Sequence, residues 1–366
     1  MQSLSKTRIG ALDGLRAVSI LLVVIGHVAG TRGFPLQENR FAASLALFGV
    51  RVFFVISGFL ITRILFEEAA NTGGVSLGRF YFRRTLRIFV PYYVFLLTMF
   101  LLDRSGIVLF TSGDLGAAAT YTSNYRPHLP WQLAHTWSLS VEEQFYLLWP
   151  AALVFLGRRR GLILVALAMI AVPLIRIATW RFAPALHEGI GHRFETCADS
   201  LATGCLLAGV RDWLGARRLY ARYATASVAL GVAVLALGTI VFDSHPQIAF
   251  AFGWSMQNIA IAFIIDVCLR DARGAWSWLS SAPATALGRM SYSIYLWQQL
   301  FLDRQSNAAM CRFPINLFAV AGISALSYYA IEKGSLALRQ RLEGRLFSRN
   351  ASRLAPVGDV LGIDGA

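Results

Sequence analysis

Blocks of about 20 consecutive apolar residues recur along the whole chain, and they constrain its fold more than any other feature. A helix of this length crosses a hydrocarbon core about 30 Å thick. Helices also satisfy every backbone polar group within the segment, as a bilayer requires. Charged residues make up 15% of the chain, against about 25% in soluble proteins. We therefore predict an all-α polytopic membrane protein.

The apolar blocks predict ten transmembrane spans. They cover approximately residues 12–32, 45–66, 86–102, 136–156, 161–180, 196–214, 223–242, 247–269, 284–303 and 314–337. Arginine and lysine precede the first block and cluster after every even-numbered one, whereas the connection 243–246 has none and the long segment 103–135 has only Arg104 and Arg126. Cytoplasmic loops carry this excess of positive charge. The alternation predicts that both termini are cytoplasmic.

One domain accounts for nearly the whole chain. We expect an integral membrane domain over residues 1–342 and a short disordered cytoplasmic tail over 343–366, which has no apolar block. The first apolar run follows positive residues, as in a signal peptide, but Arg16 interrupts it and many further spans follow. We therefore expect it to remain as the first span. The sequence shows no internal repeat of the kind that marks many transporters.

The net charge of +14 has a topological explanation. A nucleic-acid-binding protein would carry its positive residues on a water-facing surface. Here they lie in short connections between apolar blocks, so we expect membrane lipid as the surroundings and no nucleic-acid partner. The four cysteines form no CxxC pair, and we expect buried thiols and no metal site: Cys197, Cys205, Cys268 and Cys311.

Two ionisable residues in the first span require an explanation, because each costs roughly 2.5–3.5 kcal/mol inside a bilayer. Arg16 follows Asp13-Gly14-Leu15, and His27 comes eleven residues later. Eleven residues make about three helical turns, so both side chains project from one face, about 16 Å apart. A packed structural histidine is the alternative for His27. Other polar groups at a similar depth favour a functional one.

The fourth span brings two carboxylates into the bilayer. It reads Trp137-Ser138-Leu139-Ser140-Val141-Glu142-Glu143-Gln144-Phe145-Tyr146 and enters from the outside, which would place Glu142 about 9 Å from the outer end. That is close to the depth of His27. A carboxylate beside an imidazole would fix its tautomer and raise its basicity. A structural ion pair with a buried arginine is the alternative for Glu142.

Three more ionisable residues fall in the outer halves of predicted spans. Arg51 and Arg176 could pair with the glutamates or bind an anionic acceptor, and the sequence does not choose between these roles. Asp199 could contact sugar hydroxyls. Its position near a helix N-terminus, where an acid is favourable, makes a capping role the stronger interpretation.

The connection after the second block is denser in charge than topology requires. It reads Arg79-Phe80-Tyr81-Phe82-Arg83-Arg84-Thr85-Leu86-Arg87. Arginine binds phosphate through a bidentate fork, so this cluster suits a polyphosphate ligand. Attraction to anionic lipid is the alternative.

Five segments, in this order, resemble the acyltransferase-3 family of membrane acyltransferases over about residues 8–338. They are Asp13-Gly14-Leu15-Arg16 with His27, Gly49-Val50-Arg51-Val52-Phe53-Phe54-Val55-Ile56-Ser57-Gly58-Phe59-Leu60-Ile61, Arg83-Arg84 with Arg87-Ile88 and Pro91, the glutamate segment quoted above, and Gly288-Arg289-Met290-Ser291-Tyr292-Ser293-Ile294-Tyr295-Leu296-Trp297. The resemblance implies ten spans, a cytoplasmic acyl-CoA donor and a hydroxyl acceptor at the outer side.

The resemblance also implies roles for individual residues. His27 would be the catalytic base and Glu142 its acidic partner, with the donor engaged by Arg16, Arg83, Arg84 and Arg87. We expect supporting roles for Asp13, Arg51, Glu143 and Asp199. Family members often carry a histidine where Gln298 stands, so we assign that position no acid–base role. Some members also carry an esterase-like domain after the last span, where we expect only the short tail.

The function that the resemblance implies is transfer of an acyl group, expected to be acetyl, from cytoplasmic acyl-CoA to a hydroxyl of a cell-surface carbohydrate. The acceptor would be an O-antigen, an exopolysaccharide or a similar glycan or glycolipid. The expected location of the protein is a bacterial inner membrane. We expect no bound cofactor, since acyl-CoA is a co-substrate. Direct attack by the acceptor and an acyl-His27 intermediate both fit. A transporter or flippase for a lipid-linked glycan is the alternative function.

Overall fold

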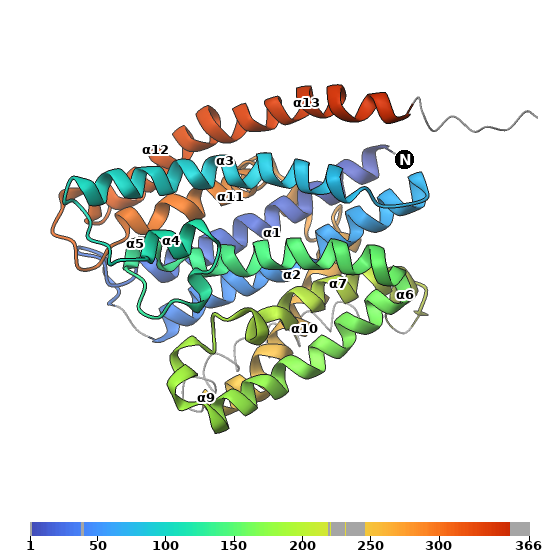
Figure 1. Cartoon of the computed structure of the whole chain (residues 1–366), viewed down its shortest axis with the longest axis horizontal. Coiled ribbons are helices and arrows are strands. Elements are labelled where there is room, and N and C mark those ends of the chain that lie inside the picture. The colour runs from blue at the N-terminus through green and yellow to red at the C-terminus, as the bar shows by residue number, and fades with distance from the viewer. Residues whose placement is uncertain (1, 38–39, 219, 221–230, 232–245, 352–366) are drawn as a thin grey trace, which may run out of the picture.

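The chain folds into a helical bundle, seen here in a computed structural model (Figure 1). The structure describes residues 2–37, 40–218, 220, 231 and 246–351, and these residues contain helices and no strand. In Figure 1 the start of the first helix and the end of the last lie at the same end of the bundle. The face of the membrane at which they lie stays a prediction.

The helices follow the predicted apolar blocks closely. The long ones are α1 (Gln2–Val28), α2 (Arg40–Thr72), α3 (Leu77–Arg104), α6 (Thr136–Phe182), α7 (Phe194–Gly215), α10 (Trp254–Arg270), α11 (Ala282–Phe301), α12 (Ile315–Leu326) and α13 (Lys333–Ala351). Short helices connect them: α4 (Asp114–Ala119), η1 (Ser123–Tyr125), α5 (Trp131–Ala134), η2 (Pro184–Gly189), α9 (Pro246–Ile248), η3 (Ala249–Gly253), η4 (Ser277–Ser280), η5 (Ala309–Cys311) and η6 (Ser327–Glu332).

Six helical segments of the described chain are long and apolar enough to cross a membrane. They are Gly10–Val28, Phe41–Thr72, Leu77–Arg104, Trp131–Phe182, Ala249–Arg270 and Ile315–Leu346. The protein is therefore a multi-pass membrane protein of all-α class. The count of ten spans is not confirmed by this measure, and the predicted span 223–242 lies outside the described residues apart from residue 231.

Helix α6 contains the fourth and fifth predicted spans, and Gly157 separates them. The backbone of Gly157 has φ 73° and ψ 171°, a conformation that glycine adopts far more readily than residues with a Cβ atom. Figure 1 shows the two halves of α6 meeting at one end of the bundle and diverging from it. The boundary predicted between residues 156 and 161 is therefore correct.

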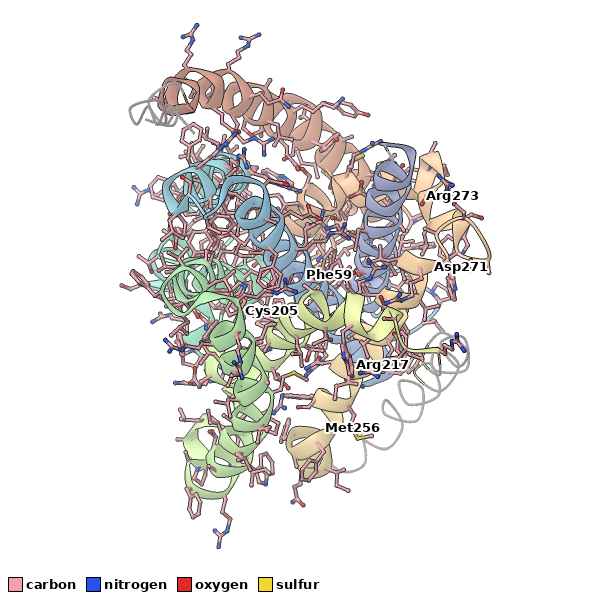
Figure 2. The ribbon with its side chains drawn as sticks, turned by 90° about the vertical axis from the view of Figure 1, so that its right-hand side faces the viewer. Phe59, Cys205, Arg217, Met256, Asp271 and Arg273 are labelled. Atoms are coloured by element: carbon pink, nitrogen blue, oxygen red, sulfur yellow. The ribbon has the colours of Figure 1, made fainter. Side chains whose placement is uncertain are left out.

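Glycines allow the closest helix crossings. A Cβ atom at Gly58 of α2 would lie 2.0 Å from the carbonyl oxygen of Leu201, and one at Gly204 of α7 would lie 2.1 Å from that of Val55. Small residues let membrane helices approach closely in this way. Phe59 and Cys205, which follow these glycines, lie inside the bundle, whereas Figure 2 shows Arg217 at its edge.

A second glycine crossing joins α1 to α11. A Cβ atom at Gly288 would lie 1.8 Å from the carbonyl oxygen of Asp13, and one at Gly14 would lie 2.1 Å from that of Leu279 in η4. This crossing fixes α11, which carries Tyr295 and Gln298, against the helix that carries His27. The same pair of helices therefore positions much of the candidate site.

Helix α13 extends to Ala351, into the segment expected to be a disordered tail, and residues 352–366 lie outside the described part. Figure 1 shows α13 running beside α3. Arg79 and Arg83 of α3 pair with Glu343, and this contact ties the start of the expected tail to the bundle. All four cysteines are free and buried, as predicted.

Candidate active site

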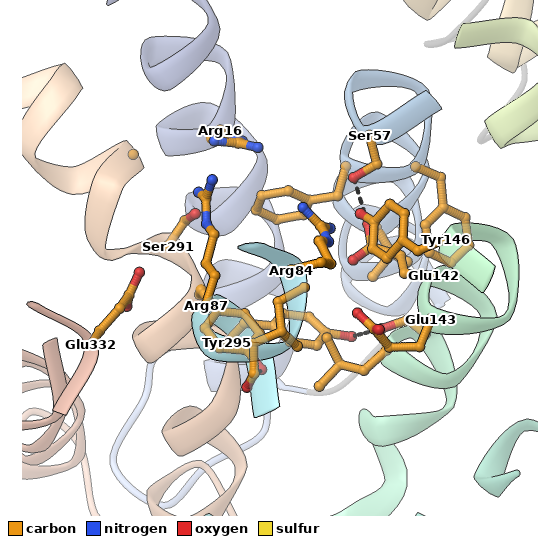
Figure 3. Close-up of a pocket in the computed structure, with 18 of the residues that line it drawn as sticks. Arg16, Ser57, Arg84, Arg87, Glu142, Glu143, Tyr146, Ser291, Tyr295 and Glu332 are labelled. Carbon is orange, nitrogen blue, oxygen red and sulfur yellow. Dashed lines mark hydrogen bonds between the residues drawn. The ribbon is translucent and has the colours of Figure 1, made fainter. Parts of the chain in front are cut away.

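The first of two cavities is lined by the side chains of Arg16, Arg84 and Arg87, and we call it the arginine pocket. It has a volume of about 90 Å³. Its walls come from α1, α2, α3, α6 and α11, with Glu332 of η6 at its edge. Figure 3 shows the three arginines and Glu142 and Glu143 converging on this space. The pocket thus gathers three of the four arginines predicted to bind a donor.

Hydrogen bonds and stacking hold the polar groups of the arginine pocket. The Ser57 hydroxyl donates to Oε1 of Glu142 over 2.7 Å, and the guanidinium of Arg84 lies 3.5 Å from the centre of the Tyr146 ring (Figure 3). The Ser293 hydroxyl donates to Oε2 of Glu332 over 3.0 Å. Nε of Arg84 is buried and has no hydrogen-bond partner within the described residues. An incoming acceptor group such as a phosphate oxygen would satisfy it.

Arg83 differs from the other three predicted donor ligands. It lines neither cavity, and its Nε donates to Oε1 of Glu343 over 2.7 Å. Arg79 donates to the same carboxylate oxygen over 2.8 Å. Adjacent residues on a helix point about 100° apart, so Arg83 and Arg84 cannot both face the pocket. In this structure Arg83 fastens α13 to α3, and donor binding by Arg83 stays a prediction that no contact here supports.

The second cavity is larger, about 600 Å³, and three histidines line it: His27, His135 and His192. We call it the histidine cavity. Two tryptophans, Trp131 and Trp137, also line it. Its volume lies within the range of about 300–1,000 Å³ that is usual for small-molecule sites. The remaining wall comes from α2, from α11 and from the two connections 123–131 and 185–193.

His27 is oriented by an amide side chain. Nδ1 of His27 lies 3.2 Å from Oε1 of Gln298, which is fully buried. The ring meets that of Trp131 edge-on, with 5.3 Å between centroids. The amide oxygen of Gln298 accepts a hydrogen bond from Nδ1 when that nitrogen carries the proton, and in that tautomer Nε2 is the unprotonated, basic nitrogen.

The guanidinium of Arg304 binds the C-terminal end of α1 beside His27. Nε of Arg304 donates to the carbonyl oxygen of Ala29 over 2.8 Å, and Nη2 donates to that of Gly26 over 3.1 Å. The guanidinium also lies 5.1 Å from the centre of the Trp131 ring. A cation is favourable at the C-terminus of a helix.

The predicted contact between His27 and Glu142 is not formed in this structure. Glu142 lines the arginine pocket, and the side chain that contacts Nδ1 of His27 is Gln298. The reason is depth. Helix α6 begins at Thr136, as predicted, but α1 ends at Val28 instead of residue 32, so His27 lies in the last turn of its helix. His135, at the start of α6, lines the same cavity as His27, and Glu142 lies about two turns deeper along α6.

The predicted supporting residues have separate locations. Asp13 lies 3.7 Å from Arg16 in an ion pair, and Glu143 lines the arginine pocket. Arg51 is buried with its guanidinium 4.2 Å from the centre of the Trp254 ring, outside both cavities. Arg51 therefore stacks on Trp254 and forms no ion pair with either glutamate, whereas binding of an anionic acceptor stays a prediction.

Asp199 is part of a buried ion pair. Oδ2 accepts hydrogen bonds from Nη2 of Arg176 over 2.9 Å and from the Ser255 hydroxyl over 2.6 Å, and both charged side chains are almost fully buried. Asp199 lines neither cavity. The residue at the N-cap of α7 is Arg193. The capping role is therefore wrong, and the ion pair joins α6, α7 and α10.

The sequence analysis missed several residues of the two cavities. Glu332 is an acid inside the last predicted span, and the argument applied to Glu142 would have found it. Tyr295 lies within a quoted segment and Gln298 directly follows it, but an amide or a tyrosine in a span has no energetic cost comparable to that of a charge. Val50 is an ordinary apolar residue, and only the structure shows that it lines both cavities.

Two titratable groups outside the spans adjoin the histidine cavity. Burial lowers the pKa of His192 to about 4, and its ring lies against Trp137 with 4.5 Å between centroids. Burial opposes ionisation of Asp114, but hydrogen bonds from Thr111 and Arg126 outweigh it and hold the pKa of Asp114 below its usual value. Arg126, fixed by Asp114 over 2.8 Å, contributes to the cavity wall.

The site does not resemble a metal centre. Within the described ranges, no three histidine, cysteine, aspartate or glutamate side chains come together as ligands. The site instead combines a cationic pocket, a separate cavity and an imidazole with a free nitrogen.

The chain belongs to the acyltransferase-3 family, whose model, an acyltransferase domain, matches residues 9–304. It is similar to the O-acetyltransferase OatA of Staphylococcus aureus in strains NCTC 8325 / PS 47, COL and MRSA252, with 28% identity over 348 residues in each. The alignment covers 88% of this chain and 56% of each relative, so the chain spans about half the length of the curated relatives it matches. No solved structure matches the chain.

Proposed function

We propose that this protein is a membrane O-acetyltransferase that moves an acetyl group from acyl-CoA to a hydroxyl of a cell-surface carbohydrate. The observation that carries the proposal is His27, which lines a cavity with Nδ1 held by Gln298 and Nε2 free. Membership of an acyltransferase family supports the reaction type, and the relatives named as O-acetyltransferases support the acyl group. The proposed location is a bacterial inner membrane.

The donor binds at the arginine pocket. Arg16, Arg84 and Arg87 line it, and charge-assisted hydrogen bonds from guanidinium groups to phosphate are among the stronger polar contacts in proteins. The buried, unpaired Nε of Arg84 supports a ligand there. Positive residues cluster on the cytoplasmic side under the predicted topology, where acyl-CoA is available.

The acceptor binds in the histidine cavity. Trp131 and Trp137 offer flat apolar faces, and Arg126 and Arg193 line the same space as polar groups. A sugar ring has both an apolar face and hydroxyl edges, so this lining suits a carbohydrate. An O-antigen, an exopolysaccharide or a similar glycan would present such a unit.

His27 acts as the base in the proposed reaction. Nε2 accepts the proton of an acceptor hydroxyl while that oxygen attacks the thioester carbonyl carbon. The carbon–oxygen bond forms, the carbon–sulfur bond breaks, and the coenzyme A thiolate leaves and takes the proton back from His27. Gln298 accepts from Nδ1–H throughout, so the ring keeps its orientation in both protonation states.

Glu142 acts within the arginine pocket in this scheme. Its carboxylate is fixed by Ser57 and lies in the pocket with Arg84, so it positions the guanidinium that meets the donor. Glu142 remains part of the proposed catalytic machinery, but through the donor and not through His27. Its removal would therefore raise KM for the donor.

The test is thiol release from acetyl-CoA by the purified full-length protein in detergent. We expect His27→Ala to lower the rate by about 10²–10⁴-fold, the usual contribution of a general base. His187→Ala is the matched control, because His187 stacks on Trp180 and lines neither cavity. A His27→Ala protein with full activity would refute the scheme.

The same assay separates the alternatives. A transporter for a lipid-linked glycan consumes no acetyl-CoA, so the unsubstituted protein would release no thiol. A burst of labelled acyl-enzyme in the absence of acceptor would replace direct attack with an acyl-His27 intermediate.

A further inference from the structure

The two cavities share a wall. Val50 of α2 and Tyr295 of α11 line both the arginine pocket and the histidine cavity, and no other residue in the described lining of the two cavities does so. Both side chains are 6% exposed. In the proposed function, an acyl group held by the donor on one side must reach His27 on the other. This wall therefore lies between the donor and the base.

Tyr295 is fixed in this position. Its hydroxyl lies 2.6 Å from the Ser138 hydroxyl and donates to the carbonyl oxygen of His135 over 3.2 Å, so α6 holds the outer end of the ring. The Phe53 and His135 rings meet that of Tyr295 edge-on, with 6.4 Å and 5.4 Å between centroids. A ring held at its hydroxyl and on two sides cannot move aside to admit a larger group without breaking these contacts.

We propose that Val50 and Tyr295 form the passage for the acyl group and restrict the enzyme to a short acyl chain, an inference that rests on the proposed function. The isopropyl group of Val50 and the ring of Tyr295 are apolar, as the chain of an acyl group is. One methylene more or less in an apolar pocket changes the selection between substrates by about 10–200-fold. Removing part of the wall should therefore admit longer chains.

The experiment follows the depletion of two donors from one mixture. Purified full-length protein receives equimolar acetyl-CoA and butyryl-CoA with N-acetylchitotriose as acceptor, and mass spectrometry measures the loss of each donor. The ratio of the two rates within one reaction does not depend on how much of a variant is folded.

Val50→Ala is the informative variant, and Val55→Ala is its matched control. Val55 is a buried valine of the same helix and lines neither cavity. We expect Val50→Ala to raise the butyryl-to-acetyl ratio at least tenfold and Val55→Ala to leave it unchanged. Tyr295→Phe removes both tethers to α6 but keeps the ring, and we expect the same direction with a smaller change.

The failures of the two proposals are distinguishable. The passage proposal is refuted if Val50→Ala is active with an unchanged butyryl-to-acetyl ratio, or if the ratio rises equally in Val55→Ala. Either result leaves the proposed acetyltransferase reaction unaffected. No depletion of either donor by the unsubstituted protein overturns the proposed function, and the passage fails with it. If Val50→Ala does not accumulate in membranes, the ratio for Tyr295→Phe decides.

Discussion

The crossing of α1 and α11 gives the sharpest test of how this bundle is assembled. We predict that Gly288→Ala destabilises the protein. The added Cβ atom would lie 1.8 Å from the Asp13 carbonyl oxygen and 3.0 Å from the Cα atom of Asp13. These are backbone atoms, so no side chain can rotate away. The two helices must instead move apart by about 1.5 Å to restore an ordinary contact of 3.4 Å or more.

The magnitude follows from two opposing effects. Alanine favours a helix over glycine by about 1 kcal/mol. Overpacking of a tightly packed interior costs about 1–3 kcal/mol, and the upper part of that range, about 2–3 kcal/mol, applies here because only backbone atoms can yield. We therefore expect a net loss of about 1–2 kcal/mol of unfolding free energy. That loss shifts the unfolding equilibrium about 5- to 30-fold.

Gly322→Ala is the matched control. Gly322 lies in helix α12, and a Cβ atom there would meet nothing within 4 Å. The same substitution should therefore be neutral or stabilising by up to about 1 kcal/mol. Thermal denaturation of the purified proteins in one detergent measures the difference. Equal melting temperatures for Gly288→Ala and Gly322→Ala would show that the close crossing does not contribute to stability.

Three further predictions concern single side chains. Arg84→Ala should raise KM for acetyl-CoA at least tenfold, because one charge-assisted hydrogen bond to the donor is lost. Arg83→Ala should leave that KM unchanged and lower the melting temperature. Steady-state kinetics and thermal denaturation distinguish the two variants. Gln298→Leu should lower kcat about tenfold without changing KM for the donor, because the base loses the acceptor that orients it, and an unchanged kcat would contradict that role. Because burial lowers the pKa of His192 from 6.5 to about 4, the unfolded chain binds its proton first, and stability should fall as the pH drops from 6.5 towards 4. His192→Asn should flatten that fall when melting temperatures are compared between pH 4 and pH 7.

Charges inside apolar blocks made part of the site predictable. Arg16, His27, Glu142 and Glu143 are expensive in a bilayer, and each lines one of the two cavities. The same rule picked out Arg51 together with Arg176 and Asp199, which lie outside both. The free-energy cost of burying a charge shows that the charge needs a partner, but it does not show whether that partner is a ligand or another side chain.

The depth of a side chain along its helix and the direction in which it points were less predictable. The pairing of His27 with Glu142 required the outer end of a helix to be known within about one turn, and α1 ends at Val28, about one turn before the predicted end at residue 32. Arg83 and Arg84 are adjacent in a charged segment, where no apolar periodicity shows which side chain faces the bundle. Both points concern a helix's end or rotation, and neither concerns its existence.

The placement of Arg16 and His27 on one helix explains why the site has two compartments. In the proposed function, eleven residues of helix separate Arg16, at the donor, from the base His27 by about 16 Å, and each of the two lines a different cavity. A single crossing partner, α11, contributes both the amide that contacts His27 and the tyrosine in the shared wall. Because Gly288 of α11 lies directly against Asp13 of α1, the spacing between these two helices sets how closely Gln298 approaches His27.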